Sequence, residues 1–210
     1  MTELLDFEAL AAAEVHQQPY PYFVVEQSLI TDRISELMQD FPELNDGGSF
    51  TLDGLATGAS FDALIEELNG QEFRQQVSQK LDVDLQTLPM IVTLRGISRP
   101  KDGRIHTDSK SKIATILIYF NEPWSSETGK LRVLRSKNMD DMAAELTPNA
   151  GSMLAFKVTD NCWHGYPAFA GVRRSIQINF VADAAAVKKH HNRHGFTAKL
   201  KGLKTLFRRS

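Results

Sequence analysis

The chain has little cysteine, no long apolar run and no basic N-terminal stretch, and each absence narrows what it can be. Its 210 residues include one cysteine, Cys162, so no disulfide can form within the chain. No apolar run approaches the roughly 20 residues that a membrane-spanning helix needs. The acidic first residues lack the positive start of a secretory signal. These features predict a cytoplasmic protein without a transmembrane segment.

Acidic side chains are missing from one region, the C-terminal segment 188–210. This segment holds eight of the 24 Lys and Arg residues and no Asp or Glu. The rest of the chain therefore carries 16 basic against 26 acidic residues, which argues against a nucleic-acid partner. We expect residues 1–187 to form a single domain, followed by a basic helical segment.

The apolar stripe of that segment allows two interpretations. Its members stand at helical spacing: Phe196, Leu200, Leu203 and Phe207. The stripe packs against the domain or a second copy in a homodimer, or it makes peripheral contact with an anionic membrane surface. Packing is the favoured interpretation, because the segment is short and the body is acidic.

The whole chain is 42% apolar and 24% charged, which is typical of a globular protein. Its first half mixes helical and extended patterns. Apolar spacing predicts helices near 4–11, 30–41, 60–68 and 71–81, a strand at 22–25 and a loop at 43–59. Ser60 is the expected N-cap of the third helix.

From Met90 the apolar period shifts towards two, which is typical of strands. We expect strands from residue 90 onward and near 112–121, 129–135, 152–157 and 172–182. Short strands separated by turns favour an antiparallel barrel or sandwich. The fold class is therefore α+β with a mainly β core, in which N-terminal helices buttress one face of the sheet.

Three polar residues in this half form a pattern with chemical meaning. His106 and Asp108 are two residues apart, on one side of an extended segment, and His164 follows 58 residues later, a distance that several antiparallel strands need to return. Two imidazoles and one carboxylate can hold iron(II) on one face and leave the other positions open. Zinc also accepts these ligands.

An arginine pair follows the second histidine. Arg173 and Arg174 are adjacent and point to opposite faces of a strand, so either can be an inward cation that clamps a carboxylate. The spacing from His164, and Ser175 two residues beyond Arg173, favour Arg173.

The motifs around these residues resemble those of the iron(II)- and 2-oxoglutarate-dependent dioxygenases, most closely the prolyl-hydroxylase-like branch. The resemblance spans about residues 90–182. It rests on His106-Thr-Asp108, the strand-like run 113–121, Thr128-Gly-Lys-Leu131, the run 149–156, Trp163-His164-Gly165 and Arg173-Arg-Ser175.

This resemblance implies a double-stranded β-helix, also called a jelly-roll or cupin-like fold, and the cofactors Fe(2+), 2-oxoglutarate and O2. It assigns the metal to His106, Asp108 and His164. It assigns the distal carboxylate of 2-oxoglutarate to Arg173 and Ser175, adds Tyr119 as a hydrogen-bonding residue, and places Leu131 on a strand beside the cosubstrate.

The expected activity is hydroxylation of an unidentified small-molecule or peptidyl substrate, with release of succinate and CO2. Asp108 favours hydroxylation, because halogenating relatives lack this carboxylate. Two alternatives stay open: a catalytically silent metal-binding jelly roll that senses or binds, and another metalloenzyme such as an isomerase or hydrolase. The motif Arg173-x-Ser175 argues against the last of these.

Overall fold

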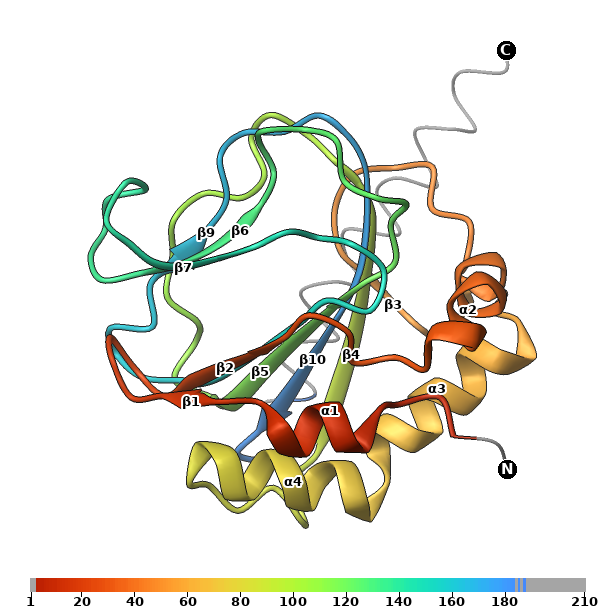
Figure 1. The fold of residues 1–210 in the computed structure, drawn as a ribbon, viewed down its shortest axis with the longest axis horizontal. Helices are drawn as coiled ribbons and strands as arrows, with labels where there is room; N and C mark the ends of the chain where they lie inside the picture. The colour runs from red at the N-terminus through yellow and green to blue at the C-terminus, as the bar shows by residue number, and fades with distance from the viewer. Residues whose placement is uncertain (1–2, 184, 186, 188–210) are drawn as a thin grey trace.

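The computed structural model describes residues 3–183, 185 and 187 (Figure 1). The helices are α1 (Phe7–Ala12), the 3₁₀ turn η1 (Thr31–Arg33), α2 (Ile34–Asp40), α3 (Ala59–Asn69) and α4 (Gln71–Leu81). The strands are β1 (Val15–His16), β2 (Tyr22–Val25), β3 (Phe50–Thr51), β4 (Met90–Ser98), β5 (Lys112–Tyr119), β6 (Leu131–Leu134), β7 (Met142–Leu146), β8 (Met153–Lys157), β9 (His164–Gly165) and β10 (Gly171–Val181).

The strands form two antiparallel sheets. The major sheet has seven strands in the order β1-β2-β8-β5-β10-β4-β3, and the minor sheet has three in the order β7-β6-β9. Figure 1 shows the minor sheet over one face of the major sheet, with α1, α3 and α4 beneath the other. This arrangement is the expected double-stranded β-helix with buttressing helices.

Strand β10 shows why the major sheet has two different faces. Its residues Ile176, Ile178 and Phe180 are fully buried in the cluster that also holds the helices. The alternate residues Ser175 and Gln177 therefore point to the other side, into the space under the minor sheet. Apolar residues thus anchor the sheet to the helices, and polar residues of the same strand line the interior.

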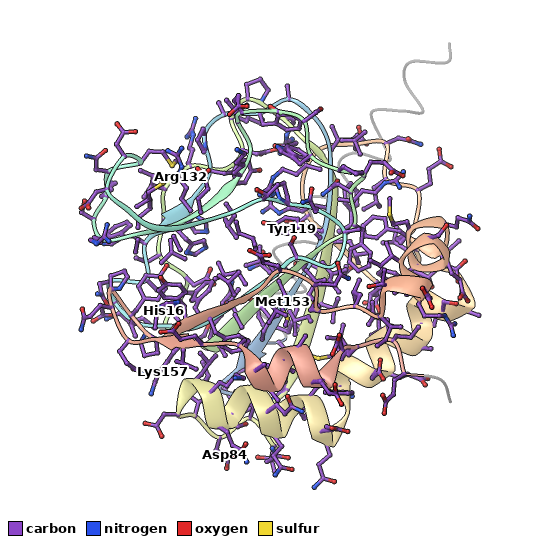
Figure 2. All side chains as sticks on the ribbon, in the orientation of Figure 1. His16, Asp84, Tyr119, Arg132, Met153 and Lys157 are labelled. Atoms are coloured by element: carbon purple, nitrogen blue, oxygen red, sulfur yellow. The ribbon has the colours of Figure 1, made fainter. Side chains whose placement is uncertain are left out.

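The register of the central strands aligns further residues on that inner face. Ser175 lies opposite Arg95 of β4 on one side and Tyr119 of β5 on the other. Residues directly opposite each other in a sheet share a face. Figure 2 shows Tyr119 within the molecule and Asp84 at its edge, beyond α4. The inner face therefore combines an arginine, a serine and a tyrosine in one row.

Helices α3 and α4 cover the outer face through narrow apolar stripes. In α3 the stripe is Phe61, Leu64 and Leu68, and all three are fully buried. In α4 the residues Phe73 and Val77 recur at one-turn spacing and are also fully buried. The expected helix at 71–81 matches α4, and both stripes follow the i, i+3, i+4 pattern of amphipathic helices.

The cap of α3 differs from the expectation. The helix begins at Ala59 with Gly58 as N-cap, so the interpretation of Ser60 as the cap was wrong. The backbone amide of Ser60 donates instead to Oδ2 of Asp40, at 2.8 Å, and Asp40 is the last residue of α2. A side chain distant in sequence thus satisfies an amide that a local cap normally serves.

Four short strands were not expected, and the first of them, β1, pairs with β2. Strand β3 lies inside the expected loop 43–59 and pairs with β4. Strand β7 pairs with β6, and the two-residue strand β9 pairs with the other side of β6. Strands β1, β3 and β9 have two residues each, which is too few to show a period in the sequence.

The expected basic helix at 188–210 lies outside the described residues. Within the part of the chain that the structure describes, no helix is long and apolar enough to cross a membrane.

Replacing Asp40 with alanine should lower the free energy of unfolding by about 1 kcal/mol, because the first turn of α3 loses a side-chain acceptor. Urea unfolding measures this. Asp32→Ala, at an exposed position in η1, is the control and should change stability by less than about 0.5 kcal/mol. Equal effects of the two substitutions would contradict the capping role.

Candidate functional site

A main-chain bridge brings the two histidines together. The amide of His106 donates to the carbonyl of His164 and the amide of His164 donates to the carbonyl of His106, both at 3.0 Å. The imidazole rings lie 4.3 Å apart between centroids. His164 belongs to β9, so the bridge adds the loop before β5 to the edge of the minor sheet.

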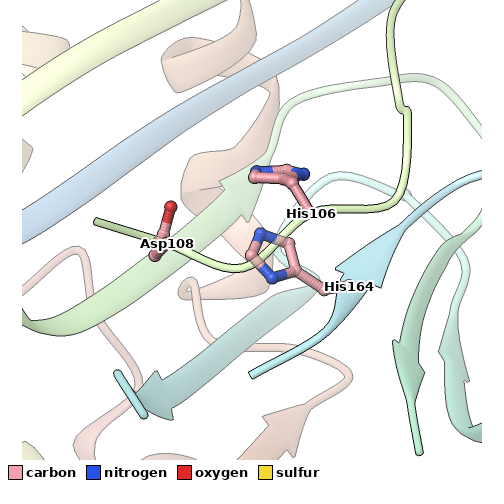
Figure 3. Close-up of side chains that lie close together, drawn as sticks. All are labelled: His106, Asp108 and His164. Carbon is pink, nitrogen blue, oxygen red and sulfur yellow. The ribbon is translucent and has the colours of Figure 1, made fainter. Parts of the chain in front are cut away.

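Asp108 completes the cluster. One ligand atom from each of His106, Asp108 and His164 lies within 4.8 Å of the others (Figure 3). The structure thus brings together the three residues that the sequence singled out, in a volume that one metal ion can fill.

Both histidines have a defined orientation. Nδ1 of His106 is 2.9 Å from the carbonyl oxygen of Arg104, and Nδ1 of His164 is 2.8 Å from that of Cys162. A carbonyl only accepts, so each Nδ1 carries the proton and each Nε2 keeps its lone pair. This is the arrangement that metal-binding histidines use, with the second nitrogen held by an outer partner.

Side chains, not main-chain groups, hold Asp108. Lys112 Nζ donates to Oδ1 at 2.8 Å and Thr115 Oγ1 donates to Oδ2 at 2.6 Å. The Asp108 side chain is 5% exposed. Burial acts to raise the pKa of this carboxyl, but the charge of Lys112, the proximity of His164 and the two hydrogen bonds outweigh it and lower the pKa. The carboxylate is therefore ionised and available to a cation.

His164 is buried, and burial lowers its pKa to about 4, with a further contribution from the neighbouring His106. Asp108 acts in the opposite direction. At neutral pH the ring is uncharged, which is the form that binds metal.

Arg173 lies in the interior and is 3% exposed. Its Nε donates to the carbonyl of Gly129 at 2.8 Å, and its Nη2 donates to the hydroxyl of Tyr119 at 3.0 Å. The guanidinium carbon stands 3.8 Å from the ring centre of Tyr166. Among the described residues no acidic side chain pairs with Arg173, although a buried cation normally has an anionic partner.

Two hydroxyl groups beside Arg173 have capacity for the same missing anion. Ser175 Oγ is buried and has no hydrogen-bond partner in the described protein. The Tyr119 hydroxyl accepts a hydrogen bond from Arg173, and its own proton stays available for donation. Burial raises the pKa of Tyr119, so the hydroxyl keeps this proton. A carboxylate would satisfy all three groups, because it offers several lone pairs and one negative charge.

The neighbouring Arg174 faces the opposite way. It lines a surface groove of about 530 Å³ with Phe120 and Trp124. The two arginines lie where the register of β10 against β4 shifts, and Arg173 is the one that faces the interior. Leu131 is 3% exposed and packs in the inner apolar cluster with Tyr119 and Tyr166.

Gly129 shows how the chain reaches Arg173. Its φ is +82°, a conformation that favours glycine, and a Cβ would come within 2.8 Å of Trp124. Its carbonyl accepts the Nε proton of Arg173. The positive φ and the close approach of Trp124 thus explain why the Thr128-Gly-Lys-Leu131 motif has glycine at its second position.

Sequence reasoning missed three residues around these groups: Lys112, Thr115 and Tyr166. Lys112 and Thr115 begin β5 and hold Asp108. Tyr166 stacks on Arg173 and shares a hydrogen bond with Ser98, at 3.0 Å between the two hydroxyl oxygens. Thr115 could have been found from the sequence, because it lies four residues before Tyr119 and therefore on the same face of the strand. The proximity of Tyr166 to Arg173 follows only from the tertiary structure.

The comparisons with known proteins agree with this geometry. Residues 96–181 match the family model described as the 2OG-Fe(II) oxygenase superfamily. The match covers less than half of the chain. Members use Fe(2+), 2-oxoglutarate and O2, so the expected cofactors and the expected resemblance are confirmed at the level of the family.

Solved structures resemble the fold of this chain at low sequence identity. A prolyl-4-hydroxylase from Pseudomonas putida aligns with a TM-score of 0.56 and 16% identity, covering 85% of this chain and 93% of its own. Prolyl 4-hydroxylases from Phytophthora capsici align at 0.55 and 15%, covering 87% and 67%. A 2OG complex of the viral collagen prolyl hydroxylase from Paramecium Bursaria Chlorella virus-1 aligns at 0.53 and 13%, covering 77% and 96%. No curated protein matches significantly. The fold is prolyl-hydroxylase-like.

The metal-free protein should lose stability as the pH falls from 6.5 to 4. The pKa of His164 is about 4 in the folded state and 6.5 ordinarily, so the unfolded chain binds more protons in this window. The free energy of unfolding should therefore decrease as the pH is lowered, by up to about 3 kcal/mol at pH 4. Urea titrations across the window measure the slope. His164→Gln should flatten it, whereas His16→Gln, at an exposed position, should leave it. An unchanged slope in His164→Gln would refute this cause.

The opposite orientations of the two arginines predict different effects on 2-oxoglutarate affinity. Arg173→Gln should raise the Kd by roughly a hundredfold, since losing one side of a buried charge pair costs about 3 kcal/mol. Arg174→Gln should change the Kd by less than about threefold. Calorimetry with the metal-loaded protein measures both. A larger effect at Arg174 would make the outward arginine the clamp.

Proposed function

We propose that this chain is an Fe(II)- and 2-oxoglutarate-dependent hydroxylase. His106, Asp108 and His164 hold the metal. Arg173, Ser175 and Tyr119 bind the distal carboxylate of 2-oxoglutarate. Leu131 packs beside the cosubstrate as part of the apolar wall.

One observation carries this proposal: the same domain holds a three-residue cluster of possible metal ligands and a buried arginine, Arg173, that forms no ion pair with the described residues. The cluster supplies two Nε2 lone pairs and an ionised carboxylate. Arg173 and the Ser175 hydroxyl, which has no hydrogen-bond partner among the described residues, can bind an anion. A metal site alone needs no such cation, and a cosubstrate with a metal-chelating end and a distal carboxylate uses both.

Bound iron with 2-oxoglutarate supplies the oxidising chemistry, in which O2 is reduced, the cosubstrate is decarboxylated to succinate and CO2, and a substrate C–H bond becomes C–OH. The protein supplies position. The backbone carbonyls of Arg104 and Cys162 fix the orientation of the two imidazoles, of which His106 is exposed and His164 is buried. The rings of Tyr166 and Tyr119 both contact the guanidinium of Arg173, which limits its rotation.

A prolyl residue is the first substrate to test. The structural neighbours include prolyl 4-hydroxylases, which is a likeness of fold at 13–16% identity. Free amino acids and other small molecules form the second group. Loops determine specificity in such scaffolds, and we assign this role to 43–59, 97–105 and 136–148.

The alternative is a catalytically silent metal-binding jelly roll. Turnover of 2-oxoglutarate decides between the two functions.

The experiment is an anaerobic titration of apoprotein with iron(II) and then 2-oxoglutarate, followed by visible absorption. We expect a charge-transfer band that requires both components. It should be lost in His106→Ala and need more cosubstrate in Arg173→Gln.

Admission of O2 then tests catalysis. Succinate should form, and prolyl peptides or amino acids that accelerate its release identify the substrate class. Metal binding without a band, or a band without succinate, would establish the silent module instead.

A further inference from the structure

The three candidate metal ligands are held in two different ways. Main-chain carbonyls hold His106 and His164, so no substitution of an outer residue removes these contacts. Side chains of Lys112 and Thr115 hold Asp108, one on each carboxylate oxygen. The carboxylate is therefore the ligand whose surroundings depend on particular side chains.

Lys112 is an unusual partner for a metal-binding carboxylate. Its side chain is 14% exposed and that of Asp108 is 5% exposed, so water screens the pair poorly. Local structure sets the contact: the Lys112 amide donates to the Ser109 carbonyl at 2.9 Å, and this turn directs the first residue of β5 back to Asp108. Within the described residues, Asp108 is the only acid that pairs with Lys112.

This ion pair has a consequence for metal binding. With Lys112 in place, a divalent cation must share Asp108 with an ammonium only 2.8 Å from Oδ1. Like charges that close, in a poorly screened interior, repel strongly. We propose that Lys112 is a positioning residue that weakens the site's affinity for divalent metal and keeps Oδ1 of Asp108 away from the ion. The inference rests on the proposed metal site.

Removing Lys112 has two opposing effects, and the structure decides which dominates. Loss of the ammonium removes the repulsion and leaves a buried carboxylate uncompensated, so metal binding gains. Loss of the hydrogen bond from Lys112 frees the carboxylate to rotate, which lowers the affinity for the metal. Thr115 still donates to Oδ2 at 2.6 Å, which keeps Asp108 in place. The gain should therefore exceed the loss.

The test compares Lys112→Met with Lys110→Met. Methionine keeps most of the aliphatic stem and removes the charge. Lys110 pairs with Asp160, but both are exposed, at 86% and 79%, so this pair is the matched control. Anaerobic iron(II) titration against a competing chelator, without 2-oxoglutarate or O2, gives the Kd. Lys112→Met should bind iron at least tenfold more tightly, and Lys110→Met should stay within twofold.

A second measurement guards against a folding defect. Lys112→Met should have a lower Tm without metal and a larger rise in Tm on adding iron(II) than the parent chain, and the charge-retaining Lys112→Arg should restore the parent's Kd to within threefold. If Lys112→Met binds iron equally or more weakly while folded, the inference is wrong. If His106→Ala binds iron as the parent does, the metal site itself is wrong, and the two failures are thereby distinguished.

Discussion

The paired hydrogen bonds between His106 and His164 are the constraint on which the site depends. They join a loop that precedes β5 to β9, a strand of only two residues. Because both bonds run between main-chain atoms, the distance between the rings is set by the sheet. Asp108 then reaches the cluster by the alternation of an extended chain, and β5 begins four residues later.

The interior has two charged centres of different character. At the metal end, Asp108 is compensated by Lys112 and hydrogen-bonded by Thr115. At the other end, Arg173 is surrounded by tyrosine rings and neutral acceptors, with no acid paired among the described residues. A buried charge without a counterion is costly, and such an arrangement persists where a ligand completes it. These two centres are the basis for the proposal that a divalent cation and an anion bind together.

Much of the site could be predicted from the sequence, because it depends on the local periodicity of strands and helices. The spacing of His106 and Asp108, the outward-inward alternation of Arg174 and Arg173, and the match of Tyr119 to the same face as Ser175 are all consequences of the period of a strand. Helix α4 was also predictable, since its buried residues recur at helical spacing. The cap of α3 was not, because its acceptor, Asp40, lies in another helix.

The sequence by itself determined the pattern of faces and the identity of the chemical groups: the triad, the arginine and serine, and a mainly β core under helices. Periodicity is a local property, and the amino acids display it directly. The tertiary structure alone decided which side chains surround those groups. Lys112 meets Asp108 through a turn, and Tyr166 stacks on Arg173 across the interior. Strand β3 is defined by its pairing with β4, and strands β7 and β9 by their pairing with β6. These are contacts between segments with no shared period, so only folding brings them together.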